Sequence, residues 1–202
     1  MSALFLVKYR QGIIFEGIFP GIVTALSSRQ ERWYKGRHSH DFSETLPVGK
    51  SIDSGKMLES APIVVNGEVT PFTLGGKYDF LLQYDDGNYG IIDTKLVANG
   101  GKAKFYWPQL GAYAYILANP KDGEPRHCTT LGLVVWTAAD ASHLDGSQFT
   151  VGFIADYEPV DLNPAGFELL IAEIVTCLMG DIPEENSECA QCKFLQKMRS
   201  RS

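Results

Sequence analysis

One hairpin constrains the fold of this chain more than any other feature of its sequence. Residues 74–84 (LGGKYDFLLQY) and 88–97 (NYGIIDTKLV) are rich in the apolar and aromatic residues that favour β-strands. The intervening Asp85-Asp86-Gly87 is typical of a tight turn, because glycine adopts the left-handed backbone conformation without a steric penalty. The segment therefore predicts two antiparallel strands.

The length of the turn decides which side chains of the hairpin face each other. A three-residue loop closed by a left-handed Gly87 pairs Tyr84 with Asn88, and counting outward places Asp79 opposite Asp93. Lys95 then lies two residues further along the same face. A two-residue loop would turn Asp79 to the face away from Asp93, so the sequence permits the facing aspartates without requiring them.

The rest of the chain alternates between predicted helices and strands. Apolar spacing and capping residues predict a helix over residues 21–35, a helix opened by Pro108 that runs to about Ala118, and a last helix from Asn163 to Gly180. Strands are expected over residues 130–138 and 149–155, a short hairpin at Asn66-Gly67 within residues 62–72, and a loop over residues 36–61. This order predicts an α/β (α+β) fold with a central mixed β-sheet flanked by helices.

Length and composition favour a single globular domain. The chain has 202 residues, of which 45% are hydrophobic and 21% charged, close to the average of folded domains. We expect one domain with an N-terminal helical and loop part (residues 1–61), a core (62–160) and a C-terminal helix and tail (161–202). No apolar run is long enough for a signal peptide or a membrane span, so we expect a cytoplasmic protein that contacts no membrane.

The acidic balance of the chain excludes one class of nucleic-acid-binding protein. The formal net charge is −6 and the pI is near 5.2, whereas a general nucleic-acid coat protein is usually basic. A local basic run remains in and just after the first helix, formed by Arg29, Arg32, Lys35 and Arg37. It is either a solvated helix face or a contact surface for a phosphate backbone. The aromatic residues at 105–107 either stack on bases or pack against the sheet.

Two aspartates that face each other on a sheet need something to offset their repulsion. A shared proton or a divalent cation would do so. Mg²⁺ or Mn²⁺ prefers oxygen ligands, which Asp79, Asp93 and the backbone carbonyl of Thr94 could supply. A bound cation lowers the pKa of water, and Lys95 is placed to orient that water or to stabilise charge on phosphorus. The arrangement is suited to phosphodiester hydrolysis.

Three short motifs, in this order, resemble the PD-(D/E)XK nuclease superfamily, and within it the RecB-type branch that includes the CRISPR-associated adaptation nucleases. The motifs are Gly76-Lys77-Tyr78-Asp79, Asp93-Thr94-Lys95, and the segment QLGAY from Gln109 to Tyr113. The resemblance implies a restriction-endonuclease-like core in which Asp79 and Asp93 bind the metal and Lys95 is the catalytic lysine. It also implies that Gln109 and Tyr113 contact the site and the substrate backbone, and their i, i+4 spacing puts both on one helix face.

The tail and the early helix depart from the family's pattern. Cys189 and Cys192 resemble the C-terminal cysteines with which these nucleases hold an iron–sulfur cluster. No cysteine precedes Cys128 and none follows Cys192, so the cluster cannot be built in the family's way, and the pair is left as a candidate cysteine site. Many members also carry a metal-binding histidine on an early helix. Residues 21–35 contain none, and His38 and His40, just after them, are either loop residues or the missing ligand.

The sequence therefore predicts a metal-dependent DNA nuclease that acts from ends or on single strands, of the kind used in DNA repair or recombination. DNA is favoured over RNA as the partner. The alternative is a subunit that keeps the nuclease fold, cuts weakly or not at all, and binds nucleic acid or a partner protein. The lost cysteines and the missing early histidine motivate this alternative, whereas the intact aspartates and lysine argue against it. A third possibility is hydrolysis of some other phosphodiester.

Overall fold

The computed structural model of this protein describes residues 21–97, 103–181 and 188–199. The described residues belong to two compact units, one within Pro20–Phe167 and one from Glu168 onward. The first unit contains the whole β-sheet and the three predicted motifs. In the part of the chain that the structure describes, no helix is long and apolar enough to cross a membrane.

The first unit is built on a five-stranded mixed sheet with the strand order β1-β6-β7-β8-β9. The strands are β1 (Gly49–Ser54), β6 (Phe80–Tyr84), β7 (Tyr89–Val97), β8 (Cys128–Asp145) and β9 (Gln148–Val160). Strands β7 and β8 pair in parallel and helix α3 (Trp107–Ala118) lies between them in the chain, while the other neighbours pair antiparallel. The predicted fold class, a central mixed sheet flanked by helices, is confirmed.

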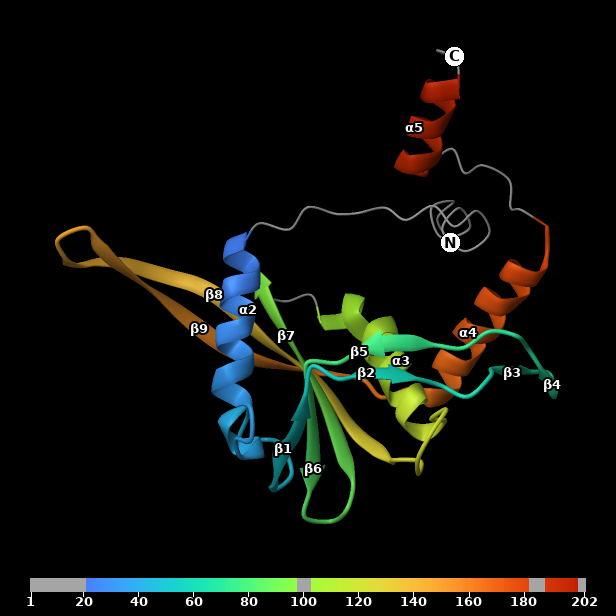
Figure 1. Cartoon of the computed structure of the whole chain (residues 1–202), viewed down its shortest axis with the longest axis horizontal. Helices are drawn as coiled ribbons and strands as arrows, with labels where there is room; N and C mark the ends of the chain where they lie inside the picture. The colour runs from blue at the N-terminus through green and yellow to red at the C-terminus, as the bar shows by residue number, and fades with distance from the viewer. Residues whose placement is uncertain (1–20, 98–102, 182–187, 200–202) are drawn as a thin grey trace. The chain divides into compact units, whose positions relative to one another are not determined.

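The described residues also include shorter strands and several helices (Figure 1). Two separate strand pairs are β2 (Met57–Glu59) with β5 (Gly75–Lys77), and β3 (Val64–Val65) with β4 (Glu68–Val69). The other described helices are α2 (Gly21–Tyr34), η1 (Ser39–Asp41), η2 (Ala103–Tyr106), α4 (Pro164–Met179) and α5 (Ala190–Arg199). Helix α4 begins as predicted, since Asn163 Oδ1 accepts a hydrogen bond from the Gly166 N–H at 2.9 Å.

Alternate residues of β6, β7 and β8 supply two cores, one on each face of the sheet. The face toward α3 buries Leu81, Ile91, Leu110, Leu117 and Leu133, and the face toward α2 buries Tyr34, Phe80, Leu82, Ile92 and Val134. Because both faces are covered, these strands are nearly continuous apolar runs rather than alternating ones. Asp93 follows Ile91 by two residues, so it faces α3 from within an otherwise apolar layer.

The hairpin between β6 and β7 has the register on which the facing aspartates depend. The Tyr84 N–H donates to the Asn88 carbonyl oxygen at 2.9 Å, and the pairing continues without a shift along β6, so Asp79 comes opposite Asp93. Gly87 closes the three-residue loop with a φ of 86°. The three-residue turn is therefore confirmed, and the two-residue alternative is wrong.

Two segments differ from the predictions. The loop expected over residues 36–61 contains η1, β1 and β2. The inward-facing residues of β1 include Gly49 and Ser51, which are small rather than apolar, so no hydrophobic alternation marks this edge strand. The strand expected over residues 74–84 is broken at Tyr78-Asp79, because β5 leaves the main sheet to pair with β2.

Other boundaries also shift, although most elements stand where they were expected. The helix over residues 21–35 and the hairpin at Asn66-Gly67 are confirmed. Strands β8 and β9 run well past residues 130–138 and 149–155, and their far ends form a two-stranded arm beyond the end of β7 (Figure 1). The tail, for which no structure was predicted, contains α5.

Candidate active site

The break between β5 and β6 places Asp79 just before β6, opposite the middle of β7. Its Oδ2 accepts hydrogen bonds from the Thr94 N–H and from Thr94 Oγ1, both at 2.8 Å. Its carbonyl oxygen accepts from the Gly55 N–H at 3.0 Å. Thr94 thus meets Asp79 through its amide and hydroxyl groups, and the role of its carbonyl as a metal ligand stays a prediction.

Asp93 places a charge inside the apolar layer of the sheet, where the residue is 2% exposed. The Lys95 ammonium contacts Asp93 Oδ2, and Gln109 Nε2 donates to Asp93 Oδ1 at 3.3 Å. Burial is the main cause that raises the pKa of Asp93 to about 6, and the nearby Asp79 carboxylate adds to it against the opposing effect of Lys95. The predicted proximity of the two aspartates and the lysine is confirmed.

Helix α3 presents Gln109 and Tyr113 to this site from one face. Gln109 Nε2 lies 3.0 Å from Tyr113 Oη, and Tyr113 Oη donates to the Lys77 carbonyl oxygen at 2.7 Å. Tyr113 is only 7% exposed, and its contact with a substrate stays a prediction. The hydrogen bond to Lys77 ties α3 to the strand that leads into Asp79.

Close packing explains why the first motif has a glycine at position 76. A Cβ at Gly76 would lie 2.6 Å from Tyr113 Cε1, well inside van der Waals contact, so the ring of Tyr113 packs directly on the backbone of β5. Tyr78, the residue before Asp79, is fully buried and its hydroxyl donates to Asp53 Oδ2 at 3.1 Å. These contacts hold the backbone that carries the Asp79 carboxylate.

Sequence reasoning missed Glu31 of α2. Its Oε1 accepts a hydrogen bond from Ser54 Oγ at 3.2 Å, and the adjacent Gly55 N–H binds the Asp79 carbonyl oxygen. Glu31 therefore lies at the edge of the site, on the helix where the family resemblance implies a histidine. One signal could have found it, since Glu31 is the only carboxylate within residues 21–34.

The structure does not bring His38 or His40 to the carboxylates. His38 Nδ1 accepts from the His40 N–H at 3.2 Å, and His40 Nε2 lies 3.2 Å from the Leu46 carbonyl oxygen. His38 bridges to Lys50, which pairs with Gln83, four residues along β6 from Asp79. At about 3.3 Å per residue, that separation is about 13 Å. This corrects the expectation that one of these histidines could stand where the missing ligand would be.

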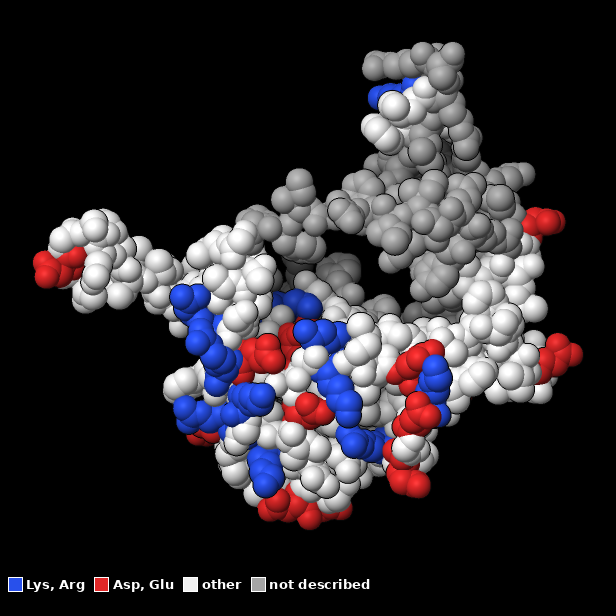
Figure 2. Space-filling view, viewed as in Figure 1, with Lys and Arg blue, Asp and Glu red and all other residues white. Residues whose placement is uncertain are grey.

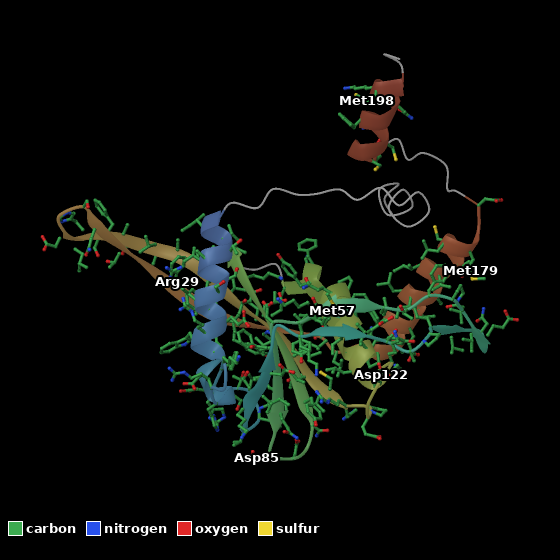
Figure 3. The ribbon with its side chains drawn as sticks, in the orientation of Figure 1. Arg29, Met57, Asp85, Asp122, Met179 and Met198 are labelled. Carbon is green, nitrogen blue, oxygen red and sulfur yellow. The ribbon has the colours of Figure 1, made fainter. Side chains whose placement is uncertain are left out.

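The basic run of the first helix is exposed. Its members are Arg29, Arg32, Lys35 and Arg37, and Figure 3 labels Arg29 on α2. Figure 2 shows Lys and Arg side chains along α2 and again toward β2 and β5, with Asp and Glu side chains between the two groups. Exposed cations on both sides of an acidic centre can hold a phosphate backbone across it.

The cysteines of the tail belong to no group of described residues that could hold a metal ion. Cys189 and Cys192 lie at the start of α5 in the second unit, and Cys128 is buried at the start of β8 in the first. The structure describes all four cysteines of the chain, and none of them forms a disulfide. Among the described residues, no set of three or more His, Cys, Asp or Glu side chains could together hold a metal ion.

Asp79 and Asp93 nevertheless fit a hard divalent cation in a two-carboxylate site. Mg²⁺ commonly binds through one or two carboxylates and keeps several waters, so a third protein side chain is not required. The buried Asp93 carboxylate already attracts positive charge, because the Lys95 ammonium contacts its Oδ2. Burial and the neighbouring Asp79 raise the pKa of Asp93, and a bound cation would offset both effects.

Comparisons with known proteins add little to this geometry. No family model matches the chain, and no curated protein matches it. Among solved structures it is similar to one titled "Crystal structure of SSO0001", with 19% sequence identity and a TM-score of 0.46 over 87% of this chain and 68% of that chain. This likeness concerns the fold alone and carries no argument about the site.

Proposed function

We propose that this protein is a metal-dependent nuclease of the PD-(D/E)XK superfamily, RecB-type branch, that hydrolyses DNA phosphodiester bonds. The observation that carries the proposal is the meeting of Asp79, Asp93 and Lys95 on the α3 face of the sheet, with Gln109 bound to the second oxygen of Asp93. The packing of the sheet does not require these groups. Buried charged side chains with a raised pKa and a specific partner gather at functional sites.

Each of these residues would have its own role in phosphodiester hydrolysis. A divalent cation held by Asp79 and Asp93 would supply the charge that lowers the pKa of water and neutralises a phosphate oxygen. Lys95, held by Asp93, would orient the attacking water and offset the charge that develops on the phosphate. Gln109 would keep Asp93 oriented, and Tyr113 would hold the strand that carries Asp79.

The exposed cations of α2 support a nucleic-acid substrate. Arg29, Arg32, Lys35 and Arg37 would contact phosphates, and the partner we propose is DNA, attacked from ends or as single strands in the cytoplasm. Each phosphate contact makes the slope of log K against log salt concentration steeper by about 0.9 for a duplex and about 0.7 for a single strand. Replacing one of these cations by alanine should therefore reduce the slope by about that amount.

The test of hydrolysis uses end-labelled single- and double-stranded DNA with Mg²⁺, Mn²⁺ or EDTA. We expect cleavage that requires the metal, and a loss of about 100-fold or more in Asp93→Asn and in Lys95→Ala. Lys121→Ala is the matched control, because Lys121 also pairs with a carboxylate, Glu59 Oε2 at 2.9 Å, but lies outside the site. Cleavage that survives in both site variants would refute the proposal.

The second candidate function is a nucleic-acid-binding subunit, or one that binds a partner protein, that keeps this fold without cutting. One observation in its favour is that the Lys95 ammonium already contacts Asp93. Another is that, among the described side chains, no third carboxylate or imidazole is grouped with the two aspartates. Binding of DNA in EDTA with no cleavage under any metal would support this candidate over hydrolysis.

A further inference from the structure

Three consecutive aromatic residues precede the Gln109 face of α3, and the structure separates them. Tyr106 and Trp107 pack against the core on the α3 face of the sheet, and the Trp107 ring meets the Phe167 ring edge-on, with centroids 6.2 Å apart. Phe105 points outward and is 68% exposed. Only one of the three rings is therefore free to receive another aromatic group.

Two lysines are interleaved with these rings. Lys104 Nζ lies 5.4 Å from the centroid of Phe105, and Lys95 Nζ lies 4.8 Å from the centroid of Tyr106. Lys95 also contacts Asp93 of the acidic centre. Since Tyr106 directly follows Phe105 in the chain, the exposed ring lies next in sequence to a ring that Lys95 contacts. An exposed ring with a lysine beside it, and a second lysine at the next residue, has the composition of a platform for single-stranded nucleic acid.

We propose that Phe105 and Lys104 form a stacking site for one unpaired base of the substrate strand, with the neighbouring phosphate at Lys95. This inference rests on the proposed function and adds a subsite to it. The base would lie on the outer face of Phe105, and Lys104 would pair with the phosphate of the same nucleotide. Lys95 is assigned the neighbouring phosphate because it lies over the ring of Tyr106, the residue that follows Phe105.

Two carboxylates near this platform, those of Glu158 and Asp161, bear on where the phosphates lie. Glu158 Oε2 accepts a hydrogen bond from the backbone N–H of Ala103, the first residue of η2, at 3.1 Å. Lys104 also lines a cleft of about 420 Å³ together with Trp107 and Asp161. The Asp161 carboxylate disfavours a phosphate inside that cleft, and the phosphate is therefore assigned to Lys104 and Lys95.

The platform selects unpaired bases. A base inside a duplex already stacks on both of its neighbours, so it cannot also lie on the Phe105 ring without leaving the helix. Phe105 should consequently favour single strands and frayed ends, and it should be indifferent to the sequence, because every base has a π-face.

The test compares Phe105→Ala and Phe105→Trp with Phe149→Ala. Phe149 is the matched control, because it is also 68% exposed but lies on the β8–β9 arm. Binding of an oligothymidylate of about 12 nucleotides, and of a duplex of equal length, is measured in EDTA by fluorescence anisotropy. A 2-aminopurine within the single strand reports stacking directly through quenching of its fluorescence.

We expect Phe105→Ala to weaken single-strand binding about tenfold, to abolish the quenching, and to leave duplex binding within about twofold. Phe105→Trp should keep both binding and quenching. If Phe105→Ala behaves like Phe149→Ala in binding and quenching, the stacking site is refuted, even where the wild type cuts DNA with metal. If the wild type never cuts but Phe105 still governs quenching, hydrolysis is refuted and the stacking site stands. If the wild type binds no single strand, the stacking site is refuted.

Discussion

Replacing Asp93 by asparagine should make the protein more stable while removing its proposed activity. The pKa of Asp93 is raised from 3.8 to about 6, and a tenfold change in acidity corresponds to about 1.4 kcal/mol. Above about pH 6, the ionised carboxylate therefore costs the folded state about 3 kcal/mol relative to an ordinary aspartate. The attraction of Lys95 is already contained in that pKa, so it is not subtracted again. Asn has nearly the same shape and no charge.

The gain in stability of Asp93→Asn over the wild type should depend on pH. Because the folded state holds the Asp93 proton more tightly than the unfolded state, the contribution of Asp93 to the stability of the wild type is greatest below about pH 4 and is lost as pH rises through about 6. Asp93→Asn has no such loss. The difference in unfolding free energy should thus vanish near pH 4 and reach about 3 kcal/mol at about pH 7.5, or about 6–12 °C in the unfolding midpoint.

The assay is urea unfolding in EDTA at these two pH values, followed by circular dichroism. Asp140→Asn is the control, because it removes one negative charge from an exposed position on the arm and should change the unfolding free energy by less than about 0.5 kcal/mol. A variant that is less stable than the wild type at about pH 7.5, or a difference that does not change with pH, would refute the reasoning.

Three further predictions concern the metal and two glycines. Mg²⁺ at about ten times its dissociation constant should raise the unfolding free energy of the wild type by about 1.4 kcal/mol and that of Asp93→Asn much less, in a thermal shift titration. Gly76→Ala forces a Cβ against the Tyr113 ring and should destabilise the fold by about 1–3 kcal/mol, as urea unfolding would show; a neutral result would contradict this packing. Gly87→Ala has open space but a φ of 86°, so it should cost about 1–2 kcal/mol, whereas Gly21→Ala, also in open space and without that conformation, should cost nearly nothing in the same assay.

Much of the site could be predicted because its parts are local. The Asp85-Asp86-Gly87 turn fixes the pairing of the strands beside it, so the facing of Asp79 and Asp93 follows from a three-residue loop. In the same way, Gln109 and Tyr113 lie on one helix face because four residues make about one turn.

Other parts of the site depend on pairings between distant segments. Glu31 reaches the site only because β1 lies beside β6, which brings Ser54 and Gly55 to Asp79. The inward positions of β1 are glycine and serine, so no hydrophobic pattern in the sequence indicates that pairing. The packing of Tyr113 on the backbone of Gly76 could not be predicted either, because it requires β5 to leave the main sheet and lie against α3.

By itself, the sequence determined the hairpin, its turn, the motif helix and the class of chemistry that two aspartates and a lysine support. The tertiary structure decided which groups join them: Glu31 lies at the edge, His38 lies beside Lys50 at the far end of β6 from Asp79, and Phe105 alone of three aromatic residues faces outward. The physical reason is the range of the interactions. Turn geometry and helix periodicity act over a few residues, whereas edge-strand pairing and burial are set by segments that meet only when the chain folds.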